Sequence, residues 1–299
     1  MESLLILAEY QIALISTAVI LGLVVGSFLN VVIYRLPVMM QREWSLQCQE
    51  LLASENPESI DSASAAQYTA FNLVTPNSRC PHCENAIKPW HNIPVISFLL
   101  LGGKCAKCST PISLRYPVIE LVTGVLSGLV AYKFGATWLT LCVLVLTWSL
   151  ITMTMIDFDH QLLPDSLTLP MLWLGLLVNT IDLGLGVTLQ DAVIGAMAGY
   201  LFLWLFYWIF KLLTGKEGMG YGDFKLLAAL GAWMGWQNLL PVIILSSLVG
   251  AVWGSAMILF MGRDKSIPMP FGPFLAGAGF IMLIWGTELY TLYNNMFYA

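Results

Sequence analysis

The chain has 299 residues, of which 58% are hydrophobic and only 10% carry a charge. Soluble domains carry roughly 25% charged residues, so the composition excludes an ordinary soluble protein and predicts an all-α polytopic membrane protein. The formal net charge of -5, with no basic stripe interleaved with aromatic residues, argues against a nucleic-acid-binding protein. We expect no cleavable signal peptide, because the N-terminus is acidic and its apolar run is too long.

Hydropathy predicts about eight transmembrane segments, since about 20 apolar residues cross a bilayer core of roughly 30 Å. The first segment covers 12–34, and Arg35 and Pro37 should end it. A polar region follows over 38–115, with one short amphipathic helix expected over 42–53. The remaining predicted segments are 117–132, 136–156, 166–181, 192–213, 224–236, 239–261 and 274–293. The predicted domains are a first span (1–37), a soluble domain (38–115) and a helical membrane core (116–299).

The basic residues predict the orientation. With about eight spans, all but one of the 13 Lys and Arg residues fall on the side of the polar region, and Lys133 lies opposite. Basic residues concentrate on the cytoplasmic side of membrane proteins. We therefore expect a cytoplasmic soluble domain, with both termini on the other side of the membrane.

Two acidic stretches lie at the ends of predicted spans. They are Met155–Asp165 (MIDFDHQLLPD) and Gly218–Lys225 (GMGYGDFK). Ionisable groups at bilayer depth are costly, so they are functional candidates. The span count between them is even, which places Asp157 and Asp223 at the same cytoplasmic face. Two adjacent carboxyls share one proton, so one can act as acid and the other as base on a water. The pattern predicts an aspartyl hydrolase.

Other readings of these acidic residues compete with catalysis. The glycines of 218–222 would let an extended substrate backbone approach Asp223, and its position at a helix start favours the ionised form. A helix-capping role is the alternative, and we prefer it for Asp165, which precedes the fourth span. For Asp159 and His160, a solvated loop and a supporting role are equally favoured.

The spacing of four cysteines, C-x2-C-x21-C-x2-C, predicts a metal site. Each CxxC pair can present two thiolates, and four thiolates complete a closed tetrahedral zinc site. A small polar segment buries little core, so the metal would supply folding energy. Paired disulfides are disfavoured in a reducing cytoplasm, and a redox dithiol needs only one CxxC. The predicted structural zinc ligands are Cys80, Cys83, Cys105 and Cys108.

Six motifs together resemble a known family. They are GSFLNVVIYRLP (26–37), CPHC (80–83), GGKCAKC (102–108), SLRYPVIELVTG (113–124), IDFDHQLLPD (156–165) and GMGYGDFKL (218–226). In order and content they are similar to those of bacterial type IV prepilin peptidases, which are bifunctional leader peptidases and N-methyltransferases among the GxGD aspartyl membrane proteases. The resemblance implies that Asp157 and Asp223 are the catalytic aspartates and that the four cysteines are the zinc-type ligands.

The resemblance also implies a substrate and a place of action. Family members of the bacterial inner membrane cut prepilins of type IV pili and pseudopilins of type II secretion after a leader glycine. They then methylate the new N-terminal residue with S-adenosylmethionine. The sequence has no Rossmann-type GxGxxG site for that cosubstrate. The leading candidate for methyl transfer is the soluble domain near Gly103 and Lys104. Prepilins, pseudopilins and membrane lipid are thus the expected partners.

Two other classes of protein compete with this interpretation. A secondary transporter would also keep acids within its spans, but it would favour acids at the bilayer midplane and a repeat between its halves. Neither feature is visible in the sequence. A non-catalytic membrane scaffold with a zinc module would give Asp157 and Asp223 no reason to share a face. Mass measurement after incubation with a prepilin distinguishes all three classes.

Overall fold

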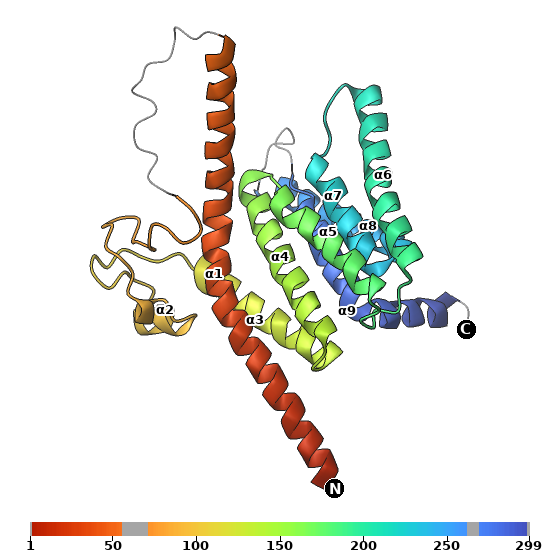
Figure 1. Cartoon of the computed structure of the whole chain (residues 1–299), viewed down its shortest axis with the longest axis horizontal. Helices are drawn as coiled ribbons and strands as arrows, with labels where there is room; N and C mark the ends of the chain where they lie inside the picture. Colours follow the sequence, from red (N-terminus) through yellow and green to blue (C-terminus); the bar gives the residue numbers. More distant parts are fainter. Residues whose placement is uncertain (1, 56–70, 262–268, 298–299) are drawn as a thin grey trace. The chain divides into compact units, whose positions relative to one another are not determined.

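The computed structural model describes residues 2–55, 71–261 and 269–297 of the chain, and these are mostly helical (Figure 1). Extended pairing within this described part is confined to two isolated bridges, which confirms the predicted all-α class. The helices are α1 (Glu2–Glu55), α2 (Ile96–Leu100), α3 (Arg115–Phe134), α4 (Trp138–His160), α5 (Asp165–Thr180), α6 (Leu189–Thr214), α7 (Tyr221–Met234), α8 (Leu239–Met261) and α9 (Gly272–Phe297), with short 3-10 turns η2 (Pro89–His91) and η3 (Trp236–Asn238).

Among the described residues, six helical segments are long and apolar enough to cross a membrane. They fall in α1, α3, α4, α6, α9 and the joined η3–α8 segment, so the protein is a multi-pass membrane protein. The other two predicted segments coincide with α5 and α7, which have only 16 and 14 residues. A 14-residue helix rises about 21 Å, less than the roughly 30 Å of a bilayer core. The count of eight spans therefore stays a prediction.

The expected end of the first helix at Pro37 is wrong. The structure has one continuous helix, α1, with Pro37 inside it. Proline removes a single i→i−4 hydrogen bond, and the residues that follow are mostly strong helix formers such as Met, Gln, Glu and Leu. The helix expected over 42–53 is consequently the last part of α1 rather than a separate element.

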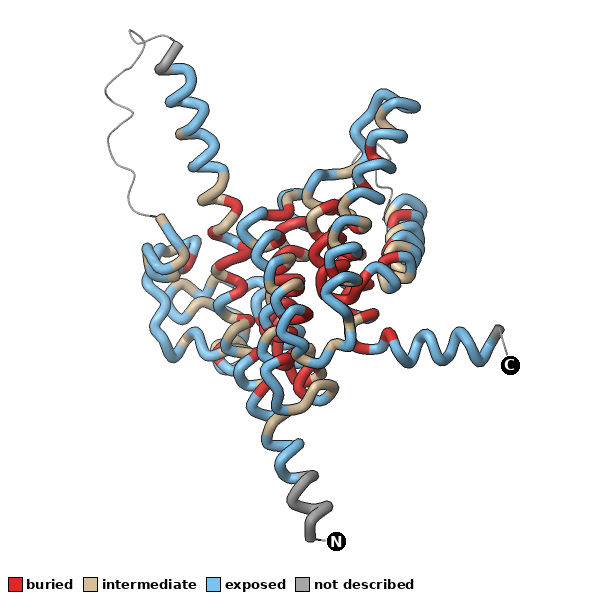
Figure 2. The backbone as a smooth tube through the Cα atoms, turned by 45° about the vertical axis from the view of Figure 1, so that its right-hand side comes forward, coloured by how far each residue is buried: buried red, intermediate tan, exposed pale blue. Residues whose placement is uncertain are grey.

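The chain divides into two compact units, residues 19–125 and residues 1–18 with 126–299. In the larger unit, α7 packs against α5, α6 and α9. Every residue from Asp223 to Met234 except Lys225 is buried, and Phe224 and Trp233 are fully enclosed. Figure 2 shows the buried residues gathered where these helices pack. The helix that carries Asp223 is therefore the centre of the core.

Glycines bring α6 and α7 into backbone contact. A Cβ added at Gly195 or at Gly231 would collide with the carbonyl oxygen of the other residue, and one at Gly199 would lie 2.7 Å from the carbonyl oxygen of Leu227. Small residues permit this close approach of membrane helices. The contact fixes the register of the two helices and places the ring of Tyr207 5.8 Å from that of Phe224.

In the smaller unit, the middle of α1 packs on the start of α3. A Cβ at Gly26 would lie 2.8 Å from Cα of Glu120, so glycine is required at this crossing. The side-chain amide of Asn30 donates to the carbonyl of Tyr116 at 3.3 Å. The buried Glu120 carboxylate accepts a 2.8 Å hydrogen bond from the backbone N–H of Val95. Glu120 is thus hydrogen-bonded within the unit.

Candidate carboxylate site and cysteine cluster

Asp157 lies in the last turn of α4, where the helix stops. Gln161 adopts a left-handed conformation with φ 53° and ψ 42°, and its N–H donates to the carbonyl of Asp157. Such a left-handed residue commonly closes a helix. The side chain of Asp157 is only 5% exposed. A buried carboxyl needs a polar partner, and the neighbouring segments supply one.

Asp223 lies in the first turn of α7 and is equally enclosed, at 6% exposed. The backbone N–H of Gly220 hydrogen-bonds its carboxyl group. Oδ1 of Asp223 is the one buried side-chain oxygen or nitrogen without a hydrogen-bond partner in the described part of the chain. An unsatisfied buried polar atom calls for an explanation, and a reacting water or substrate would provide it.

Leu163 lies close both to Gly222, next to Asp223, and to Gly272, next to the carboxylate of Asp157. A Cβ at Gly222, next to Asp223, would lie 2.6 Å from Cβ of Leu163. A Cβ at Gly272 would lie 3.2 Å from Cδ1 of Leu163 and 2.6 Å from Oδ2 of Asp157. The charge of Asp157 also acts on Asp223. The structure therefore brings together two aspartates that are 66 positions apart in the sequence.

Gly272 is part of this site, and the sequence analysis missed it. Its N–H donates a 3.0 Å hydrogen bond to Oδ2 of Asp157. Any side chain at position 272 would collide with that carboxylate. Residue 272 is uncharged and lies just before the last predicted span, so hydropathy analysis assigns it no functional role. The signal available was the Pro-Phe-Gly-Pro sequence of 270–273, which marks a special backbone.

Asp165 has a different role from the predicted helix cap. The cap position of α5 is occupied by Pro164, and no side chain caps the helix there. Both carboxylate oxygens of Asp165 instead accept hydrogen bonds from Nζ of Lys225, at 2.6 and 2.7 Å. The cap prediction is wrong because α5 already begins at Asp165, one residue after the cap position. Asp159 and His160 are exposed.

The two CxxC pairs form two knuckles with the same backbone pattern. An antiparallel bridge joins Arg79 to Ala86 in the first and Lys104 to Pro111 in the second. The residue after each second cysteine has positive φ, 53° at 84 and 57° at 109. In each knuckle its N–H donates to the carbonyl of the first cysteine. The repeated turn presents two thiols on the same side.

The four thiols are arranged as a metal site requires. One Sγ atom from each of Cys80, Cys83, Cys105 and Cys108 lies within 4.8 Å of the others, and the Cys80 and Cys108 sulfurs are 3.8 Å apart. A tetrahedral zinc ion with bonds of about 2.3 Å separates its sulfurs by about 3.8 Å. The donor set and its geometry therefore fit a metal ion bound by thiolates.

Two of these crowded thiols differ in acidity. Hydrogen bonds from Thr110 lower the pKa of Cys108 to about 6. A hydrogen bond from the backbone of Asn85 lowers the pKa of Cys83, but burial and the adjacent thiols outweigh it and raise this pKa to about 11. Crowded thiols cannot all ionise without a cation to offset their charges. A bound metal ion would remove this conflict.

Gly103 and Lys104, the residues suggested for methyl transfer, lie at the base of the second knuckle. The carbonyl of Gly103 accepts a 2.7 Å hydrogen bond from Ile112 N–H, and Gly103 has φ 68°, which favours glycine. Lys104 is exposed. A backbone role in shaping the knuckle is thus evident for Gly103, and the methyl-transfer role stays a prediction.

These features define a class, that of multi-pass helical membrane proteins with a GxGD aspartate beside a second buried aspartate. Comparison with known proteins then gives the family. Residues 20–134 match the bacterial peptidase A24 N-terminal domain, and residues 144–255 match the type IV leader peptidase family. The chain belongs to the type IV leader peptidase family.

Curated relatives match over nearly the whole chain. The chain is 55% identical over 287 residues to a protein from Stutzerimonas stutzeri, covering 96% of each chain. It is 53% identical over 287 residues to one from Pseudomonas aeruginosa, again covering 96% of each. A Neisseria gonorrhoeae protein is 50% identical over 294 residues, 98% of this chain and 97% of its own. Each is named prepilin leader peptidase/N-methyltransferase. No solved structure matches the chain.

Proposed function

We propose that the protein is an aspartyl endopeptidase that removes the leader from type IV prepilins and pseudopilins and then N-methylates the new N-terminus. The observation that carries this proposal is the pairing of Asp157 and Asp223, both buried, at adjacent helix ends. The names of relatives about half identical over almost the full chain supply the substrate and the second activity.

The chemistry requires one protonated and one ionised carboxyl. The ionised carboxylate removes a proton from water, and the water oxygen attacks the scissile carbonyl carbon while the protonated carboxyl donates to the carbonyl oxygen. The tetrahedral intermediate then collapses, the C–N bond breaks, and the leaving amine takes up a proton. Two carboxyls in one site suffice for both transfers.

The hydrogen bonding suggests which aspartate is the base. An N–H donated to a carboxylate stabilises its ionised form. Each aspartate receives one, Asp157 from Gly272 and Asp223 from Gly220, so the distinction rests on the second carboxyl oxygen of Asp223. Asp223 has Oδ1 free to meet the substrate. We therefore assign the base to Asp157 and the acid to Asp223. The helix-start argument from the sequence alone favoured the opposite assignment, but it considered no contact to Asp157.

The cysteine cluster is proposed to hold a structural zinc ion. The fit rests on the 3.8 Å sulfur separation and on the four-thiol donor set, which zinc accepts as a closed site. The ion would join the two knuckles, which share no named helix. Orientation follows from the distribution of basic residues. We place the cluster and the aspartates at the cytoplasmic side of the bacterial inner membrane.

Methyl transfer is proposed to use S-adenosylmethionine bound by the cysteine-bearing domain. The cosubstrate is polar and charged, so burying it among lipid-facing helices would be costly. Gly103 and Lys104 remain the candidate residues. A prediction separates the two activities: Asp157→Asn should still methylate a precut pilin with a free N-terminal amine, although it cannot cleave.

Mass measurement tests the proposed function directly. Purified full-length protein is incubated with a purified prepilin, with and without S-adenosylmethionine. We expect loss of the leader mass in both samples and a further gain of one methyl group only where the cosubstrate is present. An uncut prepilin in both samples would contradict the proposal, and a cut but never methylated product would leave only the peptidase.

A further inference from the structure

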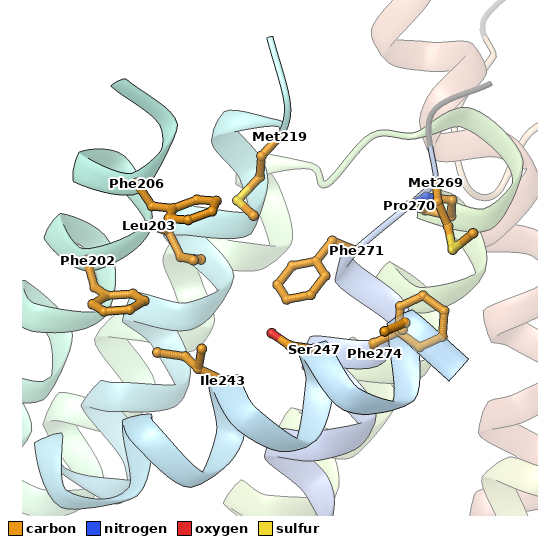
Figure 3. Close-up of a pocket in the computed structure, with 12 residues that line it drawn as sticks. Phe202, Leu203, Phe206, Met219, Ile243, Ser247, Met269, Pro270, Phe271 and Phe274 are labelled. Atoms are coloured by element: carbon orange, nitrogen blue, oxygen red, sulfur yellow. The ribbon is translucent and has the colours of Figure 1, made fainter. Parts of the chain in front are cut away.

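The larger unit has an apolar groove of about 450 Å³ between α6 and α8 (Figure 3). Aromatic rings from α6 and the start of α9 border it, and its one polar side chain is that of Ser247. S-adenosylmethionine carries charge, and burying a charge without polar partners is costly. Methyl transfer is therefore better served by the smaller unit, which holds a buried carboxylate at Glu120.

Val95, in the same smaller unit, has a strained backbone. Its φ is 59° and its ψ is -47°, and the N–H of Ile96 donates to the carbonyl of Pro94 at 2.5 Å. These features define the γ-turn whose central residue has positive φ, which is rare and strained. A positive φ is an outlier for a β-branched residue such as valine. Such conformations persist only where neighbouring groups hold them, and they concentrate at functional sites.

Glu120 supplies the group that holds this turn. Its Oε2 accepts a 2.8 Å hydrogen bond from the N–H of Val95, which fixes the peptide plane before Val95 and therefore restrains its φ. The Glu120 side chain is only 8% exposed, and the side chain of Ser27 on α1 also hydrogen-bonds it. Helices α1 and α3 thus together hold the carboxylate in place. Without this acceptor, the backbone of Val95 could relax to negative φ.

The turn determines where the residues suggested for methyl transfer lie. Val95 immediately precedes α2, so a change of its φ would redirect this short helix. The carbonyl of Phe98, on α2, accepts a 2.9 Å hydrogen bond from the N–H of Gly103. A Cβ at Gly103 would lie 3.0 Å from Cζ of the Phe98 ring, and Lys104 follows directly in the chain. A continuous series of contacts therefore joins Glu120 to the backbone of Gly103 and Lys104.

We propose that Glu120 is a positioning residue for methyl transfer, acting as the hydrogen-bond acceptor that keeps Val95 in its strained turn and α2 in place. The proposal rests on the proposed function, because it takes Gly103 and Lys104 as the methyl-transfer residues. The effect of Glu120 reaches them through Val95 and Phe98. Its role is therefore to hold their backbone, and it takes no proton from the amine. Cleavage should not depend on Glu120, since both aspartates belong to the other unit.

The first test distinguishes a hydrogen-bond acceptor from a proton acceptor. Purified full-length protein receives a precut pilin with a free N-terminal amine and S-adenosylmethionine, and it receives an intact prepilin in a parallel assay. Glu120→Ala should lower kcat for methylation by about 10-fold or more, while cleavage changes by less than about 2-fold. Glu120→Gln keeps an acceptor oxygen, so its methylation should stay within about 3-fold of wild type.

A second substitution tests the strain itself. Glycine adopts positive φ readily, so a chain with Val95→Gly no longer needs the acceptor. Adding Val95→Gly to Glu120→Ala should restore methylation to within about 3-fold of wild type. Leu121→Ala is the matched control, because Leu121 is adjacent on α3 and 47% exposed, and it should leave both activities unchanged. The zinc content of each variant reports whether the cysteine cluster is intact.

Several results would overturn the positioning role. An equal loss of methylation in Glu120→Gln and Glu120→Ala would mean that the carboxylate takes a proton. Unchanged methylation in Glu120→Ala, an equal loss of cleavage, or no recovery with Val95→Gly would refute the role as well. If the wild type does not methylate precut pilin, the proposed methyl transfer itself fails. Should Glu120→Ala not fold, Val95→Pro removes the N–H donor and imposes negative φ, and full methylation by that variant would refute the contact's role.

Discussion

The four cysteines and the two aspartates reach their sites by different routes. The cysteines come from one short polar stretch, and each pair is positioned by a turn of its own with local hydrogen bonds. The aspartates come from α4 and α7, and a third segment at the start of α9 completes their surroundings. A substitution in the cysteine cluster can therefore disturb that site and leave the packing of the membrane helices unchanged. The aspartate site, in contrast, depends on how several helices pack.

Removing either aspartate should have the largest effect. Asp157→Asn or Asp223→Asn should each lower kcat/KM for prepilin cleavage by about 1,000-fold or more, and the double variant should be no worse than either single one. The reason is that acid and base act as one unit. Cleavage assays on folded, membrane-inserted protein measure this. Near-normal cleavage by either variant would remove that residue from the pair.

Adding a methyl group at position 272 should have the second-largest effect on cleavage. In Gly272→Ala the new Cβ would lie 2.6 Å from Oδ2 of Asp157, so the carboxylate must move. Misplacement of a catalytic group by about 1 Å can cost about 100-fold, and we expect a loss of that order in kcat. Gly277→Ala is the control, because a Cβ there meets no atom within 4 Å. Equal activity of the two variants would show that Gly272 does not position Asp157.

Removing the metal ion from the cysteine cluster should affect the polar region that carries the four cysteines. Wild-type protein should hold about one zinc ion per chain, and the Cys80→Ser, Cys83→Ser double variant none. Because the ion supplies folding energy there, limited proteolysis within 71–115 should become faster. Elemental analysis and protease digestion measure both effects. Cys48→Ser, outside the cluster and exposed, should retain the ion. Metal-free, unoxidised wild-type protein would contradict the assignment.

A smaller effect should separate the two activities. Lys104→Ala should lower methylation several-fold while cleavage changes by less than about 2-fold, since Lys104 is exposed and belongs to the second knuckle, in the unit that does not contain the aspartates. Parallel rates of both steps on one prepilin sample measure the ratio. If the two rates fell together, methyl transfer would have to be placed beside the aspartates instead.

The smallest effect is expected at the ion pair between α5 and α7. Asp165 and Lys225 are 54% and 28% exposed, and exposed pairs contribute about 0–1 kcal/mol. Asp165→Asn should therefore reduce cleavage by no more than about 5-fold, and Lys225→Met by a similar factor without adding to it. Strictly additive losses in the double variant would mean that the pair does not act as one contact.

The sequence predicted what depends on local spacing or on span count. The CxxC spacing predicted the cysteine cluster, and an even number of spans predicted that Asp157 and Asp223 share a face. It could not predict the role of Gly272, because an uncharged residue 115 positions from Asp157 carries no signal that its N–H will contact that carboxylate. The Asp165–Lys225 pair, 60 residues apart, was missed for the same reason. The expected break at Pro37 failed because one lost hydrogen bond did not outweigh the helix formers on either side.

The register that glycines impose on α6 and α7 has a consequence for the supply of water. Tyr207, whose ring lies 5.3 Å from that of Tyr221, comes about two turns before α6 ends at Thr214, about 10 Å by helical rise. Asp223 is held near the level of Tyr207, well short of the end of the longer helix. Each peptide bond that is hydrolysed consumes one water molecule at that depth. The packing of α6 and α7 must therefore admit one water molecule from the bulk to this level for every bond that is cut.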